Sequence, residues 1–329
     1  MWFERLLGFE EGTMDNVRSK LELDGDRLRS KVNGRELKVG KLEIVTLENL
    51  RKRTNIEIYS EKLKIEEVVG NVQSMHQDSK NNGAIFQAAS QFNLLEMVGP
   101  HISPERGVGI YENDYTQGPA CAIACGAGTI YRNYFVQVNG QIGQSRENQI
   151  DCLDEIGREL ENSKLHLWEM NNGYALPSIE GLSLATKLIQ SKSSDEYDTL
   201  KSKLKVGIQW NTQVTLNGAQ NIVSQVYCSA LPVAYSGISP QNWKIFARLI
   251  LEATYEATLC AALVNYESTG NRNVYLTLVG GGAFGNPSQW IFDSMNQAIN
   301  KFKRAPLELK IVSYGGSSQG VQDFVRRFK

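Results

Sequence analysis

The sequence has no excess of charge of either sign. Its 35 Lys and Arg residues stand against 36 Asp and Glu residues, which gives a formal net charge of -1 at pH 7. Surfaces that bind nucleic acids or anionic membranes normally carry a basic excess. We therefore expect neither a nucleic acid nor a membrane as a partner, and we expect specificity to come from a defined site.

Long apolar runs are also missing. No stretch approaches the roughly 20 residues of a membrane span. The opening residues, Met1 to Leu7, do not place a charged region before a hydrophobic one, as a secretory signal would. With 41% hydrophobic and 22% charged residues in 329, the chain can form a sizeable core. We expect a cytoplasmic protein.

Metal ligands and cysteine pairs are sparse. The five cysteines are odd in number and lie mostly among apolar residues, as small buried side chains do. Cys121 and Cys125 are four residues apart, but no second pair or nearby histidine completes a zinc set. The sequence therefore predicts no disulfide framework, no metal site and no bound cofactor.

A dinucleotide-binding fingerprint is absent as well. No Gly-x-Gly-x-x-Gly follows an expected strand with an acidic residue after it. A Rossmann-type dehydrogenase needs that pattern to hold the pyrophosphate and the ribose. This class of oxidoreductase is therefore a poor interpretation.

The most informative stretch that is present runs from Val274 to Tyr314. Residues 274–279 are continuously apolar or β-branched, which is typical of a buried parallel strand. Residues 288–302 repeat apolar side chains at helical spacing, and 307–314 form a second strand pattern. We predict a strand, a helix and a parallel strand, with a ligand-facing loop at the carboxyl edge of the first strand.

That loop contains three consecutive glycines, Gly280, Gly281 and Gly282, before a helix N-terminus. Glycines expose backbone N–H groups and remove the Cβ atoms that would block an approaching group. Such a loop could hold a diphosphate without help from Lys or Arg. The alternative is that the glycines only form a tight turn.

Residues 1–54 form a separate extension in this interpretation. Turn signals at Asp24-Gly25-Asp26 and Asn33-Gly34 separate alternating runs, which predicts a small antiparallel meander. Thr46 is a candidate N-cap of a following helical turn. The extension could be a lid or a partner surface, but we favour a scaffold that covers a sheet edge.

Several segments, taken in order, resemble the macrodomain family. Gly70-Asn71-Val72 and Ala84 to Ser90 resemble its opening, in which Gly-Asp-Ile precedes a strand that ends in Asn-Ala-Ala-Asn. Thr116 to Val136 is similar to its small-residue turn and strand. Residues 280–287 resemble its second phosphate loop, and the strand ending in Tyr314 resembles its last strand. The resemblance covers residues 60–329, with extra material at about 137–225.

The resemblance implies an α/β fold with three α/β/α layers around a mixed sheet. The domains would be the β-rich extension 1–54 and a macrodomain-like domain 55–329 with an insertion at about 137–225. It also implies that the chain binds ADP-ribose or a related nucleotide, free or on an ADP-ribosylated protein. By position, Asn71 would contact adenine and Tyr314 would stack on it. The remaining ligand-binding residues that it implies are Gln87, Ser90, Asn93, Gly280, Gly281, Gly282, Ala283, Phe284, Gly285 and Asn286.

The sequence departs from catalytic members of that family at the acidic positions. The paired-glutamate signature of poly(ADP-ribose) glycohydrolases is absent. Hydrolysis at an anomeric carbon usually needs a carboxylate, and Glu96, Glu112 and Asp114 are the candidates. Two functions therefore stay open: an ADP-ribosyl hydrolase, and a non-catalytic module that reads ADP-ribose or another nucleotide signal.

Overall fold

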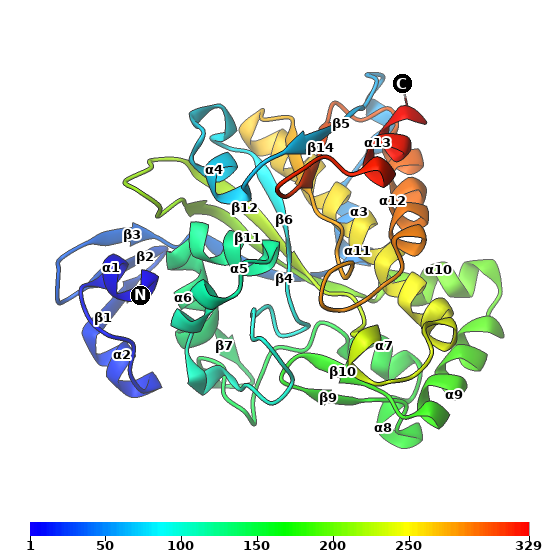
Figure 1. Cartoon of the computed structure of the whole chain (residues 1–329), viewed down its shortest axis with the longest axis horizontal. Helices are drawn as coiled ribbons and strands as arrows, with labels where there is room; N and C mark the ends of the chain where they lie inside the picture. The colour runs from blue at the N-terminus through cyan, green and yellow to red at the C-terminus, as the bar shows by residue number, and fades with distance from the viewer. Residues whose placement is uncertain (329) are drawn as a thin grey trace.

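The computed structural model describes residues 1–328, and its centre is a mixed seven-stranded sheet (Figure 1). The strand order is β4-β11-β12-β6-β13-β14-β5. From β12 to β5 all neighbours are parallel, whereas β11 is antiparallel to both β12 and β4. The strands are β4 (Lys41–Thr46), β5 (Lys64–Val69), β6 (Ile85–Ala89), β11 (Lys205–Gln213), β12 (Ile222–Cys228), β13 (Asn273–Leu276) and β14 (Glu308–Ser313).

Helices cover both faces of the sheet, as two adjacent residues of β6 demonstrate. The Phe86 ring stacks on His76 of α4 (Val72–Gln77), whereas the Gln87 amide donates to Thr258 Oγ1 of α11 (Pro240–Thr269). Successive side chains of a strand point to opposite faces. The helices α5 (Gln117–Ala124) and α6 (Gly126–Tyr134) share the side of α4. The expected three-layer α/β/α fold is therefore confirmed.

The layer around α11 contains several further helices (Figure 1). They pack on α11 and are α3 (Leu47–Arg53), α9 (Ile179–Gln190), α10 (Ser194–Ser202) and α12 (Ser288–Phe302). The prediction of a helix over 288–302 between two parallel strands is confirmed. Although α11 spans 30 residues, neither it nor any other described helix has the length and apolar character that a bilayer crossing requires.

The N-terminal part adds a small second sheet with its own core. It consists of α1 (Trp2–Leu7), α2 (Met14–Lys20), β1 (Leu21–Asp24), β2 (Arg27–Ser30) and β3 (Glu36–Lys38). The three strands form the predicted antiparallel meander. Phe3 and Leu7 pack with Tyr134 of α6 in this core. Within the range 1–54, residues 41–46 form the edge strand β4 of the main sheet, and Thr46 caps α3 as predicted.

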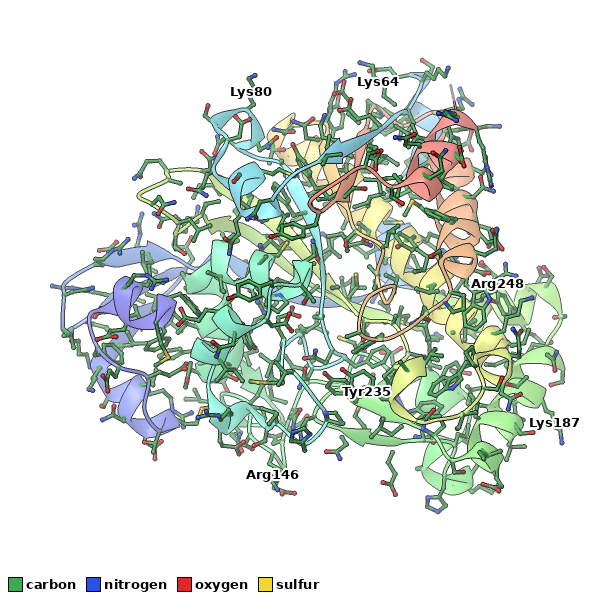
Figure 2. All side chains as sticks on the ribbon, viewed as in Figure 1. Lys64, Lys80, Arg146, Lys187, Tyr235 and Arg248 are labelled. Carbon is green, nitrogen blue, oxygen red and sulfur yellow. The ribbon has the colours of Figure 1, made fainter. Side chains whose placement is uncertain are left out.

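The region 137–225 is assembled largely from short elements along the lower and right-hand edges of the molecule in Figure 1. They include β7 (Gln137–Val138), β8 (Gln141–Ile142), α7 (Asp154–Glu159), α8 (Asn162–Leu165), β9 (Glu169–Asn171), β10 (Tyr174–Leu176), α9 and α10. Figure 2 shows Arg146 and Lys187 projecting from this region at the periphery. The same range also contains β11 and part of β12, which belong to the central sheet.

One predicted strand is wrong. Residues 129–136 are rich in β-branched and aromatic side chains, which favours a strand by composition. The structure places them in α6, with a turn after it, and Ala127, Ile130 and Tyr134 lie buried in the N-terminal core. Their spacing of three and four residues suits one helix face. Tertiary packing therefore overrides the local preference here.

The small-residue segment that precedes α6 also differs from the prediction. Residues 117–124 were expected to form a turn, and they form the helix α5. The strand predicted over 274–279 is shorter, because β13 ends at Leu276.

Candidate functional site

A cleft of about 830 Å³ opens at the carboxyl ends of β5, β13 and β14. Ligands of open α/β sheets bind at this edge. The lining at or directly after the ends of these strands consists of residues 70–73, 277–278, 312–314, Gly316 and Ser318. The loop before α5 and the first turns of α5 add Glu112, residues 114–117 and Ala120. A further wall comes from Trp2, Arg5, Leu6, Arg35 and the hairpin residues 215–218.

The side chain of Gln117 explains why the sheet opens at this point. β13 pairs with β6 only through Val274 and Tyr275. Beyond that point, Gln117 Nε2 donates to the Gln87 carbonyl over 2.7 Å, and its Oε1 accepts from the Ala89 N–H over 3.2 Å. The Gln117 amide therefore replaces a strand partner along β6, and it lines the cleft itself.

Two exposed tyrosines flank the cleft. Tyr314 follows β14 and is 72% exposed, and Tyr115 precedes α5 and is 84% exposed. Large aromatic side chains normally bury most of their surface, and an exposed ring beside a cleft offers a stacking platform. Tyr314 was predicted from the sequence, whereas Tyr115 was missed because nothing in the local pattern distinguishes it from a loop residue.

The loop that carries Tyr314 is fastened by Glu67 of β5. The Glu67 carboxylate accepts hydrogen bonds from Ser313 Oγ over 2.6 Å, from Ser317 Oγ and from the Ser318 N–H over 2.8 Å. Burial opposes its ionisation, but these three hydrogen bonds outweigh burial and lower the pKa of Glu67 below its usual value. The position of the Tyr314 backbone is therefore fixed by a charged side chain on the neighbouring strand.

Asn71 lies in the cleft lining and caps α4. Its Oδ1 accepts the Gln73 N–H over 2.8 Å. An amide oxygen has two lone pairs and the amide nitrogen has two donors, so Asn71 keeps hydrogen-bonding capacity for a ligand. Its contact with adenine stays a prediction.

The glycine-rich loop lies at the surface after β13. Gly281, Gly282 and Ala283 are exposed, and the loop is closed by hydrogen bonds from the Gly285 N–H to the Gly282 carbonyl and from the Asn286 N–H to the Gly280 carbonyl. The cleft lining reaches Thr277 and Leu278, directly before the glycines, and does not include the glycines themselves. Their role in binding a diphosphate stays a prediction.

Phe284 and Asn286 face protein groups. The Phe284 ring packs against Tyr174 and Tyr235, with centroids 5.3 and 5.7 Å apart; Figure 2 labels Tyr235. Asn286 is buried and donates to the Leu231 carbonyl. Direct ligand contact by Asn286 is therefore contradicted by its position, because its amide holds the base of the loop.

Three other predicted contacts are wrong for the same reason. Gln87 and Asn93 have no exposed surface, and Ser90 is 5% exposed. Gln87 donates to Thr258 and accepts from the Thr277 N–H; Asn93 donates to Gln149; Ser90 donates to the Gln91 carbonyl. None of the three is among the residues that line the described cleft.

Two of the candidate acids line the cleft. Asp114 is half-buried and accepts the Thr116 N–H over 2.9 Å. Glu112 accepts the Trp2 N–H over 2.7 Å and lies 3.7 Å from the Arg5 guanidinium. Glu112 therefore fastens α1 to the loop before α5, while Asp114 keeps oxygen lone pairs for a ligand or a water molecule.

The third candidate, Glu96, is a buried acid beneath the first turn of α5. It is 3% exposed, and its Oε1 has no hydrogen-bond partner among the described residues. Burial raises the pKa of Glu96 well above its usual value; the Arg132 guanidinium opposes this shift and the Asp114 carboxylate adds to it. The protonated acid is therefore favoured, and it lies behind the cleft wall, outside the lining.

Residues that could hold a metal are not clustered. Within residues 1–328, no group of three or more His, Cys, Asp or Glu side chains is arranged around a common point. The five cysteines are free and buried. Arg132 is buried over the Tyr227 ring and donates to the Leu94 carbonyl.

A comparison with solved structures found matches to poly(ADP-ribose) glycohydrolases. The enzyme from Thermomonospora curvata matches at 10% sequence identity with a TM-score of 0.47, and 96% of each chain is covered. The same enzyme bound to the inhibitor ADP-HPD matches at 10% identity and a TM-score of 0.46, with 95% of each chain covered. The enzyme from Deinococcus radiodurans in complex with ADP-ribose matches at 9% identity and a TM-score of 0.45, with 87% of this chain and 93% of that chain covered.

Neither protein-family models nor curated protein sequences gave a match.

Proposed function

We propose that the cleft binds ADP-ribose or a related NAD-derived nucleotide diphosphate. The observation that carries this proposal is the exposed Tyr314 ring on the same cleft as Asn71, at the carboxyl edge of parallel strands. An aromatic platform and an amide are suited to the face and the edge of a purine. The exposed backbone of Gly281 and Gly282, before α12, suits an anionic group beside it.

In this proposal three segments of the protein each bind a different part of the ligand. Adenine stacks on Tyr314, and its edge meets Asn71. The diphosphate lies toward the loop after β13, where main-chain N–H groups and the N-terminus of α12 supply partial positive charge. The distal ribose then faces the start of α5, where Asp114 and Gln117 line the cleft.

Binding is tested by isothermal titration calorimetry with ADP-ribose on the wild type and on Tyr314→Ala and Tyr314→Phe. Stacking of a base on an aromatic ring contributes about 1–3 kcal/mol. We therefore expect Tyr314→Ala to weaken binding by about 5- to 150-fold, and Tyr314→Phe to retain most of the affinity. ADP-ribose should also raise the melting temperature of the wild type. Absence of both heat and thermal shift with ADP-ribose, NAD and ADP would remove the nucleotide assignment.

A second candidate function is hydrolysis of an ADP-ribosyl linkage. Asp114 favours it, because a half-buried carboxylate in the cleft could orient a water molecule or stabilise positive charge at the anomeric carbon. The other interpretation is a reader that binds the nucleotide, alone or on a modified protein, without cleaving it.

Mass spectrometry of an ADP-ribosylated protein, incubated with each variant, separates the hydrolase from the reader. If Asp114 activates water, Asp114→Asn should lower product yield by at least about a hundredfold while ADP-ribose still binds. Glu112→Gln should affect the product yield mainly by loosening α1. Glu96→Gln should leave the product yield unchanged, because the introduced amide is neutral, as the protonated Glu96 carboxyl group is. Release of no product by the wild type would favour the reader; equal yields from wild type and Asp114→Asn would dismiss this acid.

A further inference from the structure

The cleft extends past the residues assigned to the nucleotide into a second arm. Its floor is the solvent face of α5, where Ala120 and Ile123 lie one turn apart. Its walls are α1, which contributes Arg5 and Leu6, and the hairpin between β11 and β12, which contributes Leu216. We call this part the N-terminal arm.

The N-terminal arm is held together by specific contacts. The Thr215 hydroxyl accepts the Gly126 N–H over 3.0 Å, which joins the hairpin to the start of α6. On the opposite side, Asn217 Nδ2 donates to Gln77 Oε1 of α4 over 2.9 Å. The Trp2 indole donates to the Val108 carbonyl, so α1 is fixed to the segment that leads into the 3-10 turn 109–113 before α5. Segments that are distant in sequence therefore enclose the arm together.

Two guanidinium groups set the charge of the arm. Arg35 lies between β2 and β3, is exposed and has no ion-pair partner among the described residues. The Arg5 side chain is 73% exposed, and its nearest carboxylate, Glu112, lies 3.7 Å away and already accepts the Trp2 N–H. Ala120, Ile123 and Leu216 give the same lining an apolar part. Arginine is suited to phosphate, which it can bind through two parallel hydrogen bonds.

We infer that the N-terminal arm binds a second phosphate-bearing part of the nucleotide ligand, beyond the diphosphate. This inference rests on the proposed nucleotide function of the same cleft. The part of the ligand in this arm would carry a phosphate group, which Arg5 and Arg35 bind. A less polar portion of the same ligand would pack on Ala120, Ile123 and Leu216. Such a phosphate could be a monoester on the adenosine ribose, or it could belong to a second nucleotide beyond the phosphate chain.

Calorimetry with three ligands tests the inference. They are ADP-ribose, ADP-ribose with a phosphate monoester on its adenosine ribose, and diadenosine tetraphosphate. Hydrogen bonds to charged groups contribute enough for at least one of the two extended ligands to bind about tenfold more tightly than ADP-ribose. The monoester identifies the first source of phosphate, and diadenosine tetraphosphate identifies the second.

The variants Arg5→Gln and Arg35→Gln, alone and combined, locate the effect. We expect the combined variant to reduce the preference for the extended ligand by about tenfold, and added salt to reduce it in the wild type. Arg29→Gln, an exposed arginine of β2 outside the cleft lining, is the matched control and should retain the preference.

The outcomes separate this inference from the proposed function. If ADP-ribose binds and neither extended ligand binds more tightly, the inference is overturned and the nucleotide site stands. The same holds if the preference survives in the combined Arg5→Gln and Arg35→Gln variant. If none of the three ligands binds, the nucleotide site itself is wrong, and the inference with it.

Discussion

Replacing Gly118 with alanine is expected to lower the free energy of unfolding by about 1–3 kcal/mol, the usual cost of overpacking a dense interior. Gly118 lies in the first turn of α5, directly on the end of β6. A Cβ added there would stand 2.1 Å from the Ala89 carbonyl oxygen and 2.5 Å from Glu96 Oε2. Because the nearest atom belongs to the backbone, the helix must move away from the strand.

That movement should also reach the cleft. Gln117 precedes Gly118 and bonds to the Gln87 carbonyl and the Ala89 N–H. Displacing α5 breaks these two hydrogen bonds and shifts the cleft wall that Gln117 and Ala120 form. We therefore expect Gly118→Ala to lose nucleotide binding together with stability, measured by urea unfolding and by calorimetry.

Gly157→Ala in α7 is the matched control. The nearest atom to an added Cβ at this position is Trp168 Cζ2 at 3.4 Å, an ordinary van der Waals contact. Alanine also favours a helix over glycine by about 0.5–1 kcal/mol. This variant should be as stable as the wild type or more stable. Equal stability of Gly118→Ala and wild type would show that α5 tolerates a side chain against β6.

Acidification from pH 7.5 to pH 5 is expected to remove about 2 kcal/mol of stability through His76 alone. His76 belongs to α4, and its buried ring stacks on Phe86 of β6. Its Nδ1 lies 2.7 Å from the Val72 carbonyl, which can only accept, so Nδ1 carries the proton. Its Nε2 lies 3.0 Å from Gln225 Nε2.

The orientation of Gln225 makes the neutral ring necessary. Gln225 Oε1 accepts the Tyr227 hydroxyl, and its Nε2 donates to the Cys121 carbonyl as well as to His76. A proton on His76 Nε2 would therefore face a donor. Burial, the largest cause, lowers the pKa of His76 to about 4, although the hydrogen bond to Val72 opposes the shift.

The sign of the pH dependence follows from these pKa values. The unfolded chain takes up a proton on His76 below its ordinary pKa of about 6.5, whereas the folded chain does so only near pH 4. Stability is therefore full above pH 6.5, falls as the pH is lowered and levels off below pH 4, with a total loss of roughly 3 kcal/mol.

Urea unfolding at pH 7.5, 6 and 5 measures this loss. His76→Gln should be less stable than wild type at pH 7.5, but the difference should shrink by about 2 kcal/mol at pH 5, because the variant has no imidazole to protonate. His101→Gln, at an exposed histidine, is the matched control for the substitution. Parallel curves for wild type and His76→Gln would assign the acid sensitivity to other groups.

The elements predicted best were those whose pattern and burial agree. The helix over 288–302 has one apolar stripe, and the structure buries Ile291, Met295 and Ile299 of that stripe on α11 and the sheet. By contrast, Thr129 to Val136 has the composition of a strand and forms most of a helix, because its partner is the N-terminal core, which no local pattern reveals.

Only some of the residues predicted for the site lie at the cleft, and their contact with a ligand stays a prediction. Asn71, Glu112, Asp114 and Tyr314 line the cleft. Gln87 and Asn93 do not, because chain order places a residue near a strand end without fixing which face its side chain takes. Arg5, Arg35 and Gln117 were missed, since their positions depend on contacts across more than 25 residues, such as the bond from Gln117 to Gln87.

The hydrogen bond from the Trp2 N–H to Glu112 joins the first helix to a residue that lines the cleft. A ligand that touches both α1 and α5 binds only the conformation in which α1 is docked, so it must shift the local equilibrium toward that conformation by the same free energy. Amide exchange in residues 2–7 would then slow in proportion to ligand concentration, and the start of the chain would report on binding at a sheet edge formed by much later residues.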